Sequence, residues 1–144
     1  MLNYFEKLLK FVSIRPRSVY EVKSWCRRKK VDPKIQAIVL EKLKELEFLD
    51  DYKFSLWWID QRLSFRPKSK RLLKLELLKK GVNREIIQKA LESVEIDEAA
   101  VAKNLIYKKE KRWKRLDEIE KKKKIINFLK SRGFNWEIIR RVIN

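Results

Sequence analysis

The chain has 144 residues, of which 44% are hydrophobic and 40% charged, and 38 Lys and Arg against 20 Asp and Glu give a net charge of +18. This hydrophobic content argues against disorder, and the charge predicts a polyanionic partner, with nucleic acid as the first candidate. Two Gly and three Pro are too few for the turns of a β-sandwich or barrel. Long helices joined by short connections are therefore predicted.

The composition also weakens several function classes. Without His the chain has no Ser-His-Asp triad and no imidazole metal ligand. Its single Cys, Cys26, permits neither a disulfide framework nor a cysteine-clustered zinc site within one chain. The longest uncharged apolar stretch, residues 54–59, is far shorter than the roughly 18 to 20 residues that cross a bilayer, and Glu6 and Lys7 interrupt any signal peptide. We expect a soluble cytoplasmic protein with no membrane contact, no metal, no cofactor and no catalysis.

An internal repeat organises the chain. Arg15-Pro16-Arg17-Ser18 recurs 51 residues later as Arg66-Pro67-Lys68-Ser69. The same offset, and then a further 52 residues, keeps six apolar positions in register: Val22, Cys26, Val31, Ile35, Val39 and Leu40, then Leu73, Leu77, Val82, Ile86, Ala90 and Leu91, then Ile125, Leu129, Phe134, Ile138, Val142 and Ile143. The sequence therefore predicts an all-α fold of three tandem three-helix repeats, residues 1–50, 51–96 and 97–144, stacked into one elongated, curved array.

The first two helices of each repeat have clear boundaries. Phe5, Leu8 and Val12 show the spacing of one helical face. Arg-Pro then ends the first helix, because Pro disfavours the α region at the residue before it. Ser18 and Ser69 are predicted to cap the second helix, since a serine hydroxyl accepts hydrogen bonds from its free N–H groups.

The end of the second helix differs among the repeats. Gly81 and Gly133 are predicted to end it with a positive φ, whereas the first repeat has Lys30 at this position. An Asp or Asn then caps the third helix in each repeat. The third repeat is predicted to begin with a longer helix, from Asp97 to Lys114, and has Leu116-Asp117-Glu118 in place of the Arg-Pro motif.

Three segments carry recognisable motifs: Phe48–Phe54 with Trp58, Ile59 and Arg62; Leu77–Val82 with Ile86 and Ile87; and Arg132–Phe134 with Ile138–Val142. Together they resemble the RecX family from about residue 2 to residue 144, most specifically in Leu-Asp-Asp-x-x-Phe followed by an aromatic residue and Arg. This resemblance implies a modulator of the RecA recombinase that lodges in the groove of the RecA–DNA filament and restrains its growth, ATP hydrolysis and strand exchange. It places the chain in homologous recombination and the SOS response. Ser55 departs from the Ala that is usual in the family, and Lys30 from its Gly.

Basic runs occur in all three repeats, and acids do not balance them as they would on an ordinary solvated surface. We predict that the following residues face the RecA filament or single- and double-stranded DNA: Arg27, Arg28, Lys29, Lys30, Arg66, Lys68, Lys70, Arg71, Lys79, Lys80, Lys121, Lys122, Lys123, Lys124, Arg140, Arg141 and Trp57. The chain is expected to act as a monomer. An alternative is a general nucleic-acid-binding protein, because residues 77–87 also fit a helix-turn-helix. An enzyme is the third and least favoured class.

Two candidate reactive sites have simpler structural interpretations. Cys26 occupies the repeat position of Leu77 and Leu129, so a buried hydrophobic role is preferred to a redox switch. Asp50 and Asp51 form an acidic pair, but no third carboxylate with ligand spacing accompanies them. Capping of a helix N-terminus is therefore preferred to Mg²⁺ binding.

The aromatic residues of the second repeat fall at polar positions of the first. Phe54 and Trp58, at i and i+4, are predicted to form the seam between repeats, and Trp57 is predicted to be the exposed aromatic of this helix. Trp113 lies within a basic run. It fits equally a base-stacking residue and a cover for the end of the core.

Overall fold

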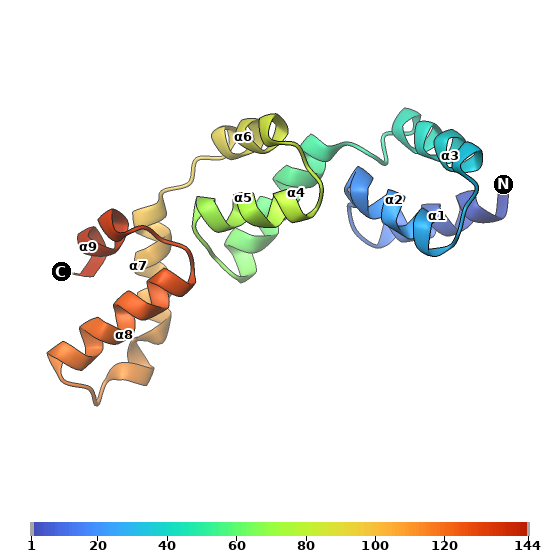
Figure 1. Cartoon of the computed structure of the whole chain (residues 1–144). Coiled ribbons are helices and arrows are strands. Elements are labelled where there is room, and N and C mark those ends of the chain that lie inside the picture. The colour runs from blue at the N-terminus through green and yellow to red at the C-terminus, as the bar shows by residue number, and fades with distance from the viewer. Residues whose placement is uncertain (1, 144) are drawn as a thin grey trace. The chain divides into compact units, whose positions relative to one another are not determined.

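Residues 2–143 are described by the structure, a computed structural model, and every regular element in that range is helical (Figure 1). The elements are α1 (Leu2–Ile14), α2 (Val19–Arg28), α3 (Pro33–Glu45), α4 (Asp51–Phe65), α5 (Lys70–Lys79), α6 (Arg84–Ser93), α7 (Glu98–Lys109), the 3₁₀ helix η1 (Glu110–Trp113), α8 (Glu118–Ser131) and α9 (Trp136–Ile143). The predicted all-α fold of tandem three-helix repeats is confirmed, while the exact repeat boundaries stay a prediction. None of the helices in this range is long and apolar enough to span a membrane.

The helices form two compact units, each made of segments that are distant in sequence. The first unit combines residues up to Trp58 with Glu76–Ser93, and the second combines Ile59–Leu75 with the residues from Val94 onward. In the first unit the side chain of Cys26 is fully buried in the hydrophobic core, and this burial raises the pKa of its thiol. The prediction that Cys26 is a core residue is thereby confirmed.

The serine of each Arg-Pro motif begins a helix and also binds a distant turn. Ser18 caps α2 in a reciprocal capping box with Glu21. Its hydroxyl donates to the carbonyl oxygen of Lys80 at 2.7 Å, within the first unit. In the second unit the backbone N–H of Ser69 donates to the carbonyl oxygen of Arg132 at 3.0 Å. Both serines are almost completely buried, so the motif joins consecutive repeats as well as starting α2 and α5.

The turns that these serines contact require glycine. Gly81 has φ +78° and Gly133 has φ +86°, as predicted for the residues after α5 and α8. A Cβ on Gly81 would lie 2.3 Å from Cβ of Tyr20, and a Cβ on Gly133 would lie 2.3 Å from Cγ of Leu72. Lys30 adopts the same left-handed conformation, at φ 54°, with its side chain exposed. The first repeat therefore forms the turn without glycine.

The first helix of the third repeat is shorter than predicted. The α-helix ends at Lys109 and continues as η1 to Trp113 instead of running to Lys114. The Trp113 ring meets the ring of Phe128 edge-on at 5.9 Å and packs against the core of the second unit. The structure therefore supports the interpretation that Trp113 covers the end of the core, over that of a base-stacking residue.

Candidate functional site

The basic residues at the end of α2 form an exposed cationic cluster in the first unit. Arg27, Arg28, Lys29 and Lys30 are all exposed, and within residues 2–143 no carboxylate lies at ion-pair distance from any of them. The Arg27 guanidinium lies 5.6 Å from the ring centroid of Tyr20, an aromatic side chain that is 47% exposed. The cluster can therefore offer cations beside an aromatic surface to a phosphate-rich or acidic partner.

The second unit carries two further basic groups. Lys122, Lys123 and Lys124 are exposed on α8 and Lys121 is half-buried there, while Arg140 and Arg141 are exposed on α9. In the described part of the chain none of these cations has an ion pair with a carboxylate. The cations on α8 follow its N-terminal turn, so the helix dipole does not favour them. The exposed cations therefore lie on α8 without stabilising it through the helix dipole.

The basic residues predicted around α5 differ in exposure. The side chains of Arg66, Arg71 and Lys79 are exposed, whereas Lys68, Lys70 and Lys80 are half-buried.

Lys80 has contacts inside the first unit. Its ammonium lies 3.6 Å from a carboxylate oxygen of Glu21 and 5.2 Å from the ring centroid of Trp58, while its carbonyl oxygen accepts from Ser18. These contacts give Lys80 a packing role inside the first unit, and its contact with a partner stays a prediction.

Trp57 is half-buried, which corrects the prediction of an exposed aromatic. Its ring lies 6.1 Å from that of Phe54 and 6.3 Å from that of Trp58, and the Arg15 guanidinium lies 5.5 Å from its centroid. Phe54 is 1% exposed, while Trp58 is half-buried and donates its indole N–H to Glu76 at 3.1 Å. The two neighbouring tryptophans therefore both take part in packing.

Glu21 links the Arg-Pro motif to this aromatic cluster. Both terminal nitrogens of Arg15 bind its carboxylate. Burial by itself would raise the pKa of Glu21, but the hydrogen bond from Ser18 N–H and the charges of Arg15 and Lys80 outweigh it and lower that pKa. Glu21 is therefore held ionised as the centre of a structural network.

The acidic pair at the start of α4 caps helices. The Asp50 carboxylate accepts from the N–H groups of Tyr52 at 2.9 Å and Lys53 at 3.1 Å, and Asp51 accepts from Val19 N–H at 2.9 Å. Burial raises the pKa of Asp51. In the described chain no three potential metal-binding side chains come together. These contacts support the capping interpretation.

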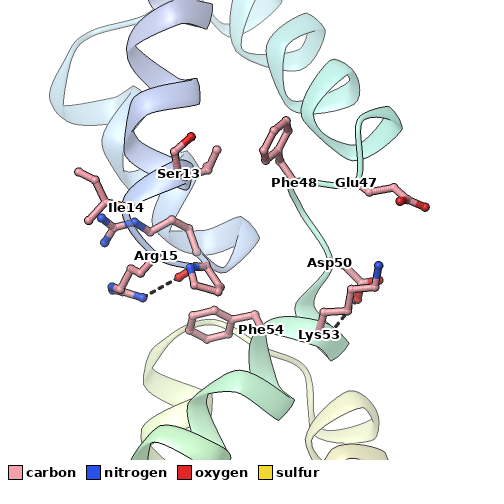
Figure 2. Close-up of a pocket in the computed structure, with 11 residues that line it drawn as sticks. Ser13, Ile14, Arg15, Glu47, Phe48, Asp50, Lys53 and Phe54 are labelled. Atoms are coloured by element: carbon pink, nitrogen blue, oxygen red, sulfur yellow. Dashed lines mark hydrogen bonds between the residues drawn. The ribbon is translucent and has the colours of Figure 1, made fainter.

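A pocket of about 350 Å³ lies in the first unit, and sequence reasoning missed it. Figure 2 shows Ile14 and Arg15 on one side of it and Phe48, Asp50 and Lys53 on the other. It lies between two connections that are distant in sequence, the one between α1 and α2 and the one between α3 and α4. The sequence feature that could have pointed to it is the apolar residue before each Arg-Pro, Ile14 and Phe65.

Comparisons with known proteins agree with this architecture. Models of the second and third three-helix domains of RecX match residues 50–91 and 95–143. The regulatory protein RecX of Chlorobium limicola is 33% identical, over 94% of this chain and 84% of its own length, and that of Finegoldia magna is 30% identical, over 96% and 69%. The crystal structure of RecX from Lactobacillus salivarius has a TM-score of 0.83 at 22% identity, covering 98% of this chain and 92% of that chain. The chain belongs to the RecX family of regulatory proteins.

Proposed function

We propose that this protein regulates the RecA recombinase by binding the RecA–DNA filament and restraining its growth, ATP hydrolysis and strand exchange. Membership of the RecX family is the observation that carries this proposal. The protein would act in the cytoplasm as a monomer, in homologous recombination and the SOS response. It would need no catalytic group, because occupancy of the filament is itself the regulatory event.

The exposed basic clusters support such a role. Each unit presents its own cations: Arg27 to Lys30 in the first, and Lys122 to Lys124 with Arg140 and Arg141 in the second. Arginine can bind phosphate or carboxylate with two parallel hydrogen bonds, and lysine adds a point charge. Several such clusters on one chain would let it contact more than one part of a nucleoprotein filament and so hinder addition or rearrangement of subunits.

The decisive experiment compares affinity for bare DNA with affinity for RecA-coated DNA at physiological salt. We expect tighter binding to the coated DNA and a shallower dependence on salt, because phosphate contacts alone give a slope of roughly −0.9 in log K per neutralised phosphate. A variant with Gln at Arg27, Arg28 and Lys29 should bind filaments less tightly. The control variant has Gln at Lys7, Lys10 and Lys34, which are also exposed on the first unit, and so loses the same amount of charge.

The second candidate function is general nucleic-acid binding. It is favoured by α9, where Trp136 is 56% exposed and Arg140 and Arg141 are exposed on the same short helix, an arrangement that suits stacking and phosphate contact. Equal affinity for bare and RecA-coated DNA, with the same steep salt slope, would favour this function over regulation of the filament.

A further inference from the structure

Large apolar side chains lie exposed at the opening of the pocket in the first unit. Ile14, the last residue of α1, is 79% exposed, and Phe48, in the connection before α4, is 41% exposed. Val12 and Phe54 line the same pocket and are 7% and 1% exposed. The pocket therefore has a buried apolar interior and large apolar side chains at its opening (Figure 2). Such uncovered apolar surface is typical of interaction sites.

The exposed hydrophobic residue is a property of the repeat. In the second unit Phe65 precedes Arg66-Pro67 as Ile14 precedes Arg15-Pro16, and it is 76% exposed. Neither side chain contributes to a core, so folding alone does not account for a large apolar residue at this position twice. The position is therefore available in both repeats for contact outside the chain.

One cation at the pocket is fixed in position before any partner arrives. Arg17 donates from Nε to the carbonyl oxygen of Phe11 at 3.0 Å, and its guanidinium lies 3.9 Å from the centroid of the Phe11 ring. Its terminal nitrogens bond no acceptor among residues 2–143. Burial and the nearby charge of Arg15 lower the pKa of Arg17, and the nearby carboxylate of Glu21 offsets them in part. A guanidinium group held in this way can form two parallel hydrogen bonds with a carboxylate.

We propose that this pocket binds a peptide segment of the protein partner in which a large apolar side chain lies next to an Asp or Glu. The apolar side chain enters between Ile14 and Phe48, and the carboxylate meets Arg17. This inference rests on the proposed function, because it takes the protein component of the filament as the source of the segment. A cavity of about 350 Å³ lies at the small end of the range for binding pockets, roughly 300–1,000 Å³, and so suits one anchoring side chain.

The pocket favours a peptide over a nucleic-acid strand. Glu47 and Asp50 line it together with Arg15, Arg17 and Lys53, so the lining carries both carboxylates and cations. A phosphodiester backbone would bring a negative charge at every nucleotide and would be repelled by the two carboxylates. A peptide with a single carboxylate aimed at Arg17 avoids that repulsion.

The first test uses a synthetic probe and needs no recombinase. A ten-residue peptide of Ser and Gly with one central Phe-Asp pair is titrated into the ¹⁵N-labelled full chain at physiological salt, beside a control in which Asn replaces the Asp. We expect amide shifts concentrated at Ile14, Arg17 and Phe48 with the acidic peptide and at least about fivefold weaker binding of the control. Shifts spread over Arg27 to Lys30 and the other basic clusters, or no shifts at all, would overturn the proposal.

The second test connects the pocket to the filament. Ile14→Ser and Arg17→Gln should each weaken binding to RecA-coated DNA by about tenfold, as expected for loss of an anchor contact. The control, Ile119→Ser, removes a 70% exposed apolar side chain from the second unit and should bind as wild type does. Unchanged filament binding by both pocket variants would refute the assignment of the partner. If the wild-type chain shows peptide-induced amide shifts at the pocket but does not bind RecA filaments, the proposed function is refuted and the peptide site is still supported.

Discussion

Gly81→Ala should be among the most damaging single-methyl changes in this protein. Gly81 follows α5 with φ +78°, a conformation that costs an ordinary residue about 1–2 kcal/mol. The new Cβ would also lie 2.3 Å from Cβ and 2.6 Å from Cγ of Tyr20. The Tyr20 atom nearest to the clash is attached directly to the backbone of α2, so a change of side-chain rotamer cannot relieve it.

The magnitude follows from these two contributions. Overpacking of this kind costs about 1–3 kcal/mol, so together with the backbone term Gly81→Ala should destabilise the chain by about 2–5 kcal/mol. For a chain of this size that corresponds to a fall in melting temperature of roughly 6–15 °C. Lys30→Gly is the matched control, because Lys30 has the same positive φ and an exposed side chain, and it should stabilise by up to about 1 kcal/mol.

Thermal and urea unfolding followed by circular dichroism at 222 nm would measure both variants. We expect the midpoint to fall for Gly81→Ala and to stay level or rise slightly for Lys30→Gly, with similar urea m-values. If Gly81→Ala unfolds at the wild-type midpoint, Tyr20 does not pack against this turn and the joining of consecutive repeats through the Ser18 motif is wrong.

Four other variants test the packing and the electrostatics. Leu77→Ala should destabilise by about 2–5 kcal/mol because Leu77 is completely buried, and Cys26→Ala should cost less since fewer atoms are removed; equal midpoints for Leu77→Ala and wild type would contradict the register of the repeats. Trp57→Ala should lower the thermal midpoint, because the Trp57 ring packs on the rings of Phe54 and Trp58. An unchanged thermal midpoint would contradict this packing role and favour contact of Trp57 with a partner. The pKa of Glu21 is lowered in the folded state, so its stabilisation is present above the ordinary pKa of a glutamate and is lost as pH falls through the lower folded value. Glu21→Gln should therefore be less stable than wild type at neutral pH and lose less stability on acidification, and parallel pH profiles of the two proteins would exclude this role.

The local architecture was predictable from the sequence alone. Apolar spacing, the proline after Arg15, the capping serine and the glycines after the second helices each act within a few residues, so they determine where helices begin and end whatever surrounds them. The repeat register likewise predicted a buried Cys26, because a position that is apolar in every copy faces the core. The structure confirms all these features.

The tertiary structure alone decided which side chains are free. Trp57 and Trp58 are neighbours about 100° apart on α4, and helical spacing suggested that one of them was exposed. Arg15, from a loop 42 positions earlier, covers Trp57, while Glu76 from α5 bonds Trp58. The pocket beside Arg17 arises in the same way from two connections that are distant in sequence. Periodicity reports which face of a helix is apolar, but exposure depends on what the rest of the chain places opposite that face, and only the folded structure specifies this.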